Sequence, residues 1–315
     1  MRRKALRPVD LPLGVVAIDG KSVWTGDEKV NDFCQRSHKE GGMPYWHFRV
    51  LRAALVSAAA PVCIDQAPIP AETNDMGAFP DFFSALRREY SRSQLFEVVT
   101  MDAGFCSEQN ARLVDEAGYG YVMGLKGNQP ELLAEAQRIL MPLADETPPH
   151  AVSSWEREGG RAVQRRFWRT REMAAWQDWS HLRRSGWSAR SLVARRAKRR
   201  WSKTVSLSPI CPWAGWIPPS ASPWSGGTGA SRTTATTRSH THWREDTGFW
   251  PRKGNGLLVC SLLRMIAYNI LWLLRVVHLR SRDARAIPWR QLRDLVRDAL
   301  VLMRTRAHRQ VLNLV

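Results

Sequence analysis

The chain has 315 residues, enough for one large domain or two smaller ones, and a formal net charge of +18. Such a charge indicates a polyanionic partner, of which nucleic acid is the commonest. The five cysteines are scattered without paired spacing, which argues against a disulfide framework or a zinc site and fits a reducing cytoplasm. No apolar run follows the basic first residues, so we expect no secretory signal.

The first half of the chain alternates strand and helix patterns. Residues 15–18 form a β-branched strand that ends on Asp19. Residues 45–57 and 61–69 are two further predicted strands, and a helix over about 81–90 leads to a strand at 95–101. Asp102 follows that strand directly. Two carboxylates therefore stand in the same situation, each at the end of a buried strand.

The stretch after Asp102 predicts a second strand joined by a helix. Ser107 can cap this helix, Gly118 ends it, and residues 119–125 form the next strand. A turn at 127–129 precedes Pro130, which suits the first turn of a helix. Two strands linked in this way are expected to be parallel neighbours with their chemistry at the carboxyl edge. For Asp102 alone, a turn or helix cap is the simpler explanation.

Three strings in this region resemble the motif blocks of DDE transposases encoded by bacterial insertion sequences. They are VVAIDGK at 15–21, TMDAGFCSEQNA at 100–111 and YVMGLKGNQPELL at 121–133. The resemblance covers roughly 13–179 and again 243–279. It implies an α/β fold with a ribonuclease-H-like, retroviral-integrase-like core, a disrupted insertion and C-terminal helices.

The resemblance also implies a site for two divalent metals, Mg²⁺ or Mn²⁺, held by three carboxylates. Asp19 would bridge the metals and Asp102 would complete one of their sites. The family's third ligand is a Glu in a string like HWGIEN, which this sequence lacks. Glu245 and the neighbouring Asp246 are the acids that could replace it, although they come later than the family's Glu should.

Several basic and polar residues are candidates for contact with DNA. Lys21 and Lys126 are expected in loops at the metal edge, and Asn128 belongs to the KGNQP turn. Residues 153–158 and 161–169 predict a hairpin that would open the family's insertion, with Arg165, Arg166 and Arg169 facing DNA. A solvated surface role is the alternative for the lysines and for the hairpin.

The segment 183–239 does not look like the rest of the chain. No acidic residue occurs between Asp178 and Glu245, and twelve Lys or Arg in that gap carry most of the net charge. With permitted codon choices, a shifted frame through 224–237 spells VRGHWGIENDCN. We therefore interpret 183–239 as an out-of-frame, poorly ordered segment; the alternative is a genuine basic, Trp-rich insert that binds DNA.

The C-terminal part returns to regular patterns. Residues 257–277 are the longest apolar stretch, but Arg264, Asn269 and Arg275 interrupt it and favour a helix packed on a soluble core over a membrane span. A final amphipathic helix is expected from Pro288 to about 305. Members of the family usually carry a helical domain before the first strand. Here that strand begins about fifteen residues after Met1.

These observations predict five segments: a basic tail at 1–12, the first part of the core at 13–140, a linker and basic hairpin at 141–182, the abnormal segment at 183–239, and helices at 240–315. The predicted function is metal-dependent cleavage and transfer of DNA strands, impaired by the missing ligand in a decayed, pseudogene-like copy. The alternatives are a non-catalytic DNA-binding remnant that regulates an intact transposase, and a structure-selective nuclease. The expected partner is double-stranded DNA at element ends and target, in the bacterial nucleoid of the cytoplasm, with no membrane and with a homodimer left open.

Overall fold

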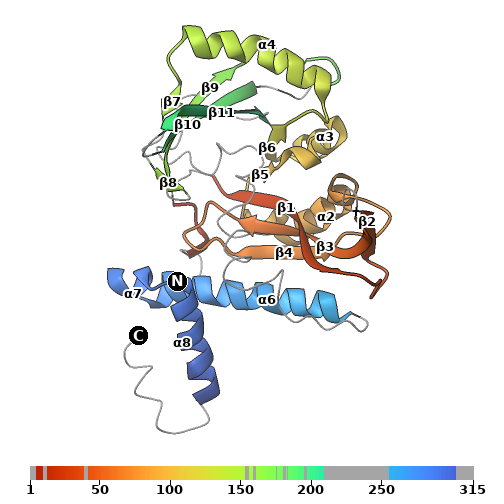
Figure 1. The fold of residues 1–315 in the computed structure, drawn as a ribbon, viewed down its shortest axis with the longest axis vertical. Helices are drawn as coiled ribbons and strands as arrows, with labels where there is room; N and C mark the ends of the chain where they lie inside the picture. Colours follow the sequence, from red (N-terminus) through yellow and green to blue (C-terminus); the bar gives the residue numbers. More distant parts are fainter. Residues whose placement is uncertain are drawn as a thin grey trace.

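The computed structural model describes residues 5–9, 13–38, 42–152, 156–158, 161–174, 176–179, 182, 184–194, 197–208 and 255–302. Its strands form one mixed sheet, with helices against it (Figure 1). The strands are β1 (Val15–Gly26), β2 (Cys34–His38), β3 (Pro44–Leu55), β4 (Cys63–Pro68), β5 (Val98–Met101), β6 (Gly120–Leu125), β7 (Ala151–Val152), β8 (Glu156–Glu158), β9 (Arg161–Thr170), β10 (Arg184–Ala194) and β11 (Ala197–Ser208).

Six α-helices and three short helical turns accompany the described strands. They are α2 (Asp75–Tyr90), η1 (Ser91–Ser93), η2 (Ala103–Phe105), α3 (Glu108–Glu116), α4 (Pro130–Glu146), α6 (Gly256–Leu273), η3 (Leu274–His278), α7 (Arg282–Ala286) and α8 (Trp289–Leu302). Asn74 caps α2 and Ser107 caps α3, each accepting a backbone N–H through its side chain. Gly118 ends α3 with a φ of 80°, as the sequence predicts.

The sheet has the order β2-β3-β1-β5-β6-β11-β10-β9-β7, and β4 pairs with the second half of β3. Strands β1, β5 and β6 are parallel, whereas β3 is antiparallel to β1. The expected ribonuclease-H-like core has this arrangement: an antiparallel β1–β3–β4 meander extended by two parallel strands that a crossover helix joins. The predicted fold class is confirmed.

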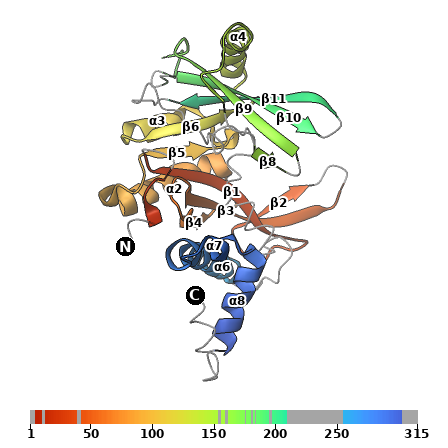
Figure 2. The same cartoon turned by 90° about the vertical axis from the view of Figure 1, so that its left-hand side faces the viewer.

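A single hydrophobic cluster unites the core strands with α2, α3 and α4. Buried residues such as Ile18, Phe83, Val99, Tyr121 and Leu132 belong to it. Helices α2 and α3 cover one side of the core strands, α4 contacts β9, β10 and β11, and α6 lies against β4 (Figures 1 and 2). Helix α8 stands away from the sheet beyond α6 in both views.

Several predicted boundaries were wrong. Strand β1 does not end at Asp19 but continues to Gly26, because β3 pairs with it along this whole length. Helix α2 begins at Asp75 instead of about 81, since the Asn74 cap starts the helix before Pro80. Helix α4 runs to Glu146 through the predicted linker that begins at 141, and Pro142 does not interrupt it.

The segment 183–239, interpreted from the sequence as out of frame and poorly ordered, contains two strands in its first part. Strands β10 and β11 occupy 184–194 and 197–208 and pair with each other and with β9 and β6. The alternation of Trp201, Val205 and Leu207 with polar neighbours is the strand pattern that would have indicated β11. The rest of this segment lies outside the described residues.

Candidate metal and DNA site

The register of β1 and β5 brings the two predicted carboxylates to adjacent positions. The paired residues of these parallel strands run from Val15 with Val98 to Ile18 with Met101. Asp19 is the next residue on β1 and Asp102 is the first residue after β5, and neighbouring strands lie about 4.8 Å apart. Ile18 and Met101 are buried in the core, so the alternation of a strand directs both aspartates to the opposite face. Both are half-buried.

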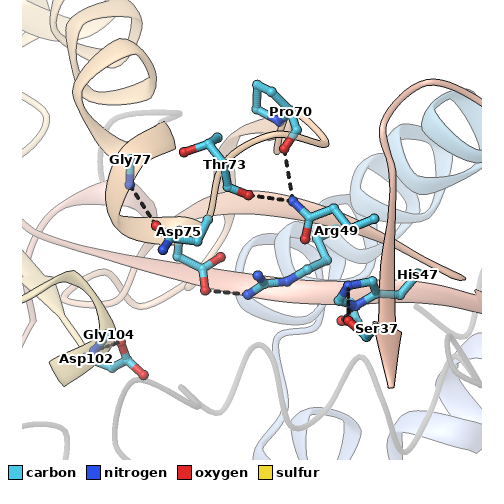
Figure 3. Close-up of polar contacts among 12 residues, drawn as sticks. Ser37, His47, Arg49, Pro70, Thr73, Asp75, Gly77, Asp102 and Gly104 are labelled. Atoms are coloured by element: carbon cyan, nitrogen blue, oxygen red, sulfur yellow. Dashed lines mark hydrogen bonds and ion pairs between the residues drawn. The ribbon is translucent and has the colours of Figure 1, made fainter. Parts of the chain in front are cut away.

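Asp102 also caps the turn that follows it. Its Oδ1 accepts a hydrogen bond of 2.8 Å from the Gly104 N–H, and its carbonyl accepts from the Phe105 N–H at 3.2 Å (Figure 3). The simpler explanation for Asp102 is thus confirmed. This capping role does not exclude metal binding by Asp102, because a carboxylate has a second oxygen that can bind a cation.

The KGNQP turn holds this same loop in place. Asn128 Nδ2 donates to the carbonyls of Ala103 at 2.9 Å and Cys106 at 3.2 Å, and Gln129 Nε2 donates to Cys106 at 3.1 Å. Gly124 on β6 lets the loop come close, since an added Cβ there would lie 3.0 Å from the Ala103 nitrogen. Asn128 therefore has a positioning role that the sequence did not predict.

Lys21 is not in a loop, which corrects the sequence prediction. It lies within β1 with only 4% of its surface exposed, two residues beyond Asp19 on the same face. Arg52 pairs with Asp19 across β1 and β3 and is equally buried, at 5% exposed. Two cationic side chains therefore share the buried face of β1 and β3 with Asp19. Burial raises the pKa of the nearby Cys63 thiol, and the charges of Arg52 and Lys21 oppose this rise.

Arg52 is a residue that the sequence analysis missed. Its Nε and Nη2 donate to Gln66 Oε1 at 2.9 and 2.7 Å, and Gln66 Nε2 donates to Ser261 Oγ of α6 at 2.8 Å. A charged residue inside the otherwise apolar run VLRAAL at 50–55 is the signal that could have revealed it. This chain of contacts connects the strand opposite Asp19 to α6.

An ion pair lies on the other face of β1. Arg49 on β3 binds Asp75 at the start of α2, and a Cβ added to Gly20 would overlap the Asp75 carboxylate (Figure 3). His47 hydrogen-bonds Ser37 at 3.0 Å and Ser22 at 3.4 Å, and burial together with Arg49 lowers its pKa. These contacts fix the N-terminus of α2 against β1.

The basic candidates of the site do not form one surface. Lys126 is exposed in the loop after β6, as expected, next to the loop that Asn128 holds. On β9, strand alternation places Arg169 on one face and Arg166 on the other, with buried Trp168, whereas the side chain of Arg165 lies outside the described ones. The predicted β8–β9 hairpin is confirmed, but its arginines are divided between two faces.

The third carboxylate is not among the described residues. Glu245 lies outside them, and no group of three His, Cys, Asp or Glu side chains within the described ranges could hold a metal. Asp19 and Asp102 together offer hard oxygen donors that suit one Mg²⁺ or Mn²⁺. A complete two-metal site is not assembled by this part of the chain.

Comparisons with known proteins cover both carboxylates. A family model described as "Transposase DDE domain" matches residues 10–203, from before β1 to within β11. The "Uncharacterized protein in dhlA 3'region" of Xanthobacter autotrophicus is 27% identical over 203 residues, which are 63% of this chain and 59% of that relative. The chain thus spans about three fifths of that relative's length.

One solved structure is similar over most of the chain. Its title is "Cryo-EM structure of piggyBac transposase synaptic complex with hairpin DNA (SNHP)", and it is 14% identical with a TM-score of 0.48. The alignment covers 96% of this chain and 55% of that one.

Proposed function

The chain belongs to the DDE transposase family, and from this premise we propose that it descends from an enzyme that cleaves and joins DNA strands with divalent metals. The observation that carries the proposal is the register that sets Asp19 and Asp102 side by side at one face of β1 and β5. These are the first two ligands that the motif blocks predict. A family match that includes both strands supports the same assignment.

In this proposal each residue of the site has a separate task. Asp19 and Asp102 would hold the metal, which when bound activates an oxygen for attack on a phosphodiester. Asn128 and Gln129 keep the Asp102 loop in one conformation through their contacts with Ala103 and Cys106. Lys126, exposed in the neighbouring loop, can meet a phosphate of the DNA backbone.

Two observations favour a second candidate, a non-catalytic DNA-binding remnant. The described residues supply two of the three acids, and buried Lys21 and Arg52 share the face of Asp19. Nearby cations oppose the binding of a metal ion. Loss of one ligand commonly costs orders of magnitude in a metal-dependent reaction, so such a chain could occupy element ends or join an intact transposase without cutting.

The hypothesis that a segment is translated out of frame also stays a proposal, but it now applies to fewer residues. The family match through 203 and the strands β10 and β11 support an in-frame reading up to there. The shifted frame would then apply after β11, from about 209 to 239, where permitted codon choices recover the string HWGIEN. Independent sequencing of the DNA for codons 170–250 tests this, because two small insertions or deletions must flank the segment if the hypothesis holds.

The functional test is nicking and joining of supercoiled plasmid that carries candidate element ends, with Mg²⁺ or Mn²⁺. The catalytic proposal predicts metal-dependent products that Asp19→Asn and Asp102→Asn abolish. Asp32→Asn, at a fully exposed remote carboxylate, should leave them unchanged. Nicking without joining would indicate a nuclease instead.

A binding assay separates the remaining outcomes. Salt-dependent binding to double-stranded DNA without nicking, unchanged by Asp102→Asn, supports the non-catalytic remnant. A chain that neither nicks nor binds DNA would refute both candidates.

A further inference from the structure

Two buried cations lie beside the first predicted metal ligand. Lys21 is two residues beyond Asp19 on the same face of β1, and Arg52 is paired with Asp19 across β1 and β3. Only 4% of the Lys21 surface and 5% of the Arg52 surface are exposed. Burying an ammonium or guanidinium group is costly unless an opposite charge lies close to it. The fold must therefore provide a counter-charge for both side chains.

Apolar residues adjoin Lys21 on the side away from Asp19. Val50 pairs with Lys21 across β1 and β3, and it belongs to one hydrophobic cluster with Leu257 from the first turn of α6. Val50 and Leu257 are both fully buried, at 0% exposed. Because aliphatic side chains do not stabilise an ammonium group, the charge of Lys21 depends on an acid nearby.

The guanidinium group of Arg52 is held by a neutral side chain. Its Nε and Nη2 atoms both donate to Gln66 Oε1, and the Gln66 amide nitrogen donates in turn to Ser261 Oγ. These contacts satisfy N–H groups and fix the plane of the guanidinium group, but they supply no negative charge. The charge of Arg52 therefore depends on an acid as well.

Among the described residues, Asp19 is the acid that the strand register places opposite Arg52. In an antiparallel pair the Cβ atoms of directly opposite residues are about 4.5–5.5 Å apart, a distance that an Asp–Arg ion pair can span. Asp65 on β4 alternates with Gln66 and therefore lies on the other face of the sheet. Asp102, which follows the strand next to β1, adds a second negative charge to the face of Asp19. The two cations are thus balanced by two aspartates of the chain itself.

We propose that Asp19 is the counter-ion of Lys21 and Arg52 in the folded chain, so that a divalent metal must compete with these two cations for the same carboxylate. The metal part of this inference rests on the proposed function, whereas the ion-pair part does not. A carboxylate that serves only as a metal ligand is repelled by its neighbouring acids without metal, so its replacement by Asn does not destabilise the metal-free protein. A counter-ion behaves in the opposite way, because its replacement leaves two buried positive charges uncompensated.

The first test is a double-mutant cycle, measured by urea denaturation of the metal-free full chain in the presence of EDTA. Asp19→Asn should lower the urea midpoint. In a chain that already carries Lys21→Met, the same Asp19→Asn substitution should lower the midpoint less, because one buried cation fewer is left uncompensated. The matched control is Lys29→Met in the loop between β1 and β2, where the lysine side chain is 46% exposed. In that background the effect of Asp19→Asn should be unchanged.

Each outcome of the cycle decides the ion-pair part. An Asp19→Asn chain at least as stable as the unmodified one overturns it, as do effects of Asp19→Asn and Lys21→Met that simply add. If Asp19→Asn does not fold, Asp19→Glu replaces it: a folded Asp19→Glu chain shows that the negative charge is what the fold requires, and an unfolded one overturns the proposal.

The second test measures the binding of Mn²⁺ without DNA, from the electron paramagnetic resonance signal of the free ion. Lys21→Met removes one competing cation and should tighten Mn²⁺ binding by about tenfold or more, whereas Lys29→Met should not change it. Equal affinities of the unmodified and Lys21→Met chains would overturn the competition. Binding by neither chain would refute the metal assignment of the proposed function, while the urea cycle would still decide whether Asp19 is the counter-ion.

Discussion

At the scale of single residues, Asn128 shows how a motif residue can hold a neighbouring loop in position. Its side chain binds the carbonyls of Ala103 and Cys106, and Gln129 also binds Cys106. Asn128→Ala leaves the Ala103 carbonyl without this donor, so we expect the free energy of unfolding to fall by about 1 kcal/mol. Urea denaturation measures this, and faster hydrogen exchange at Gly104 and Phe105 would show a looser Asp102 loop.

Lys126→Ala is the matched control for that prediction. The lysine lies two residues away in the same turn and is exposed, as Asn128 is, but its side chain makes none of the hydrogen bonds by which Asn128 holds the Asp102 loop. We expect its removal to change stability by less than about 0.5 kcal/mol. Equal effects of the two substitutions would contradict the positioning role of Asn128.

His47 gives the fold a dependence on pH. Burial, and then the charge of Arg49, lower its pKa, although Asp75 opposes them. Because the unfolded chain binds a proton more readily, this contribution to stability is complete above the unfolded pKa of about 6.5 and is lost as the pH falls through the lower folded pKa. His47→Gln should therefore reduce the loss of stability between about pH 7 and pH 5.

Urea unfolding at several pH values measures this difference. The pKa of His150 is also lowered, mainly by burial, so the variant should retain part of the pH dependence. Asp75→Asn provides an opposite test. It removes the charge that raises the pKa, so the His47 ring should titrate at still lower pH in an NMR titration. An unchanged slope in His47→Gln would refute the assignment.

At the scale of elements, the Arg52–Gln66–Ser261 chain couples the face of β1 and β3 that carries Asp19 to α6. Arg52→Ala would leave buried Gln66 without its donor and remove a cation opposite Asp19. We expect a loss of about 2–4 kcal/mol in the free energy of unfolding. Faster amide exchange in the first turns of α6 should accompany it.

Arg88→Ala is the corresponding control, because the Arg88 side chain is 77% exposed on α2 and its ion pair with Glu89 is on the surface. This substitution should change the free energy of unfolding by no more than about 0.5 kcal/mol. Comparable losses in both variants would show that Arg52 contributes only as an ordinary surface charge.

Sequence patterns predicted the elements that local chemistry determines. The caps at Ser107, Gly118 and Pro130 fixed the order of strand and helix around Asp102, and β-branched runs located β3 and β4. The burial of Lys21 could not be predicted from the sequence. It depends on β3, which pairs with β1, and on α6, which packs against this region, and both come from distant parts of the sequence. Arg52 could have been noticed, but its partner Ser261 is 195 residues from Gln66.

At the scale of the molecule, the sheet joins two parts through a short contact. Strands β6 and β11 pair at three positions, 123–125 with 205–207, whereas β1 and β3 pair at ten. Buried Trp168 and α4 add packing between the parts. We expect amides of β1 and β5 to exchange most slowly and those of β9, β10 and β11 to exchange earlier, through partial opening. Uniform protection across all of these strands would contradict this expectation.

The whole-molecule charge was a misleading guide to this architecture. Most of the net charge of +18 comes from the acid-free segment, so the motif blocks carried the prediction of a DNA partner. The register of β1 and β5, which brings Asp19 and Asp102 together, follows from pairing between residues 83 positions apart in the sequence. The family resemblance implied that the two aspartates share one site, and the assembled sheet shows that their strands are neighbours.

The pairing of β11 with β6 has a consequence for shortened copies of the gene. A stop codon before residue 197 would preserve Asp19, Asp102 and their strands but leave the N–H and C=O groups of β6 uncovered along one side. Such an open edge recruits strands from other molecules. Truncation would therefore yield a chain that aggregates in inclusion bodies and is degraded by cellular proteases, and not a smaller soluble protein.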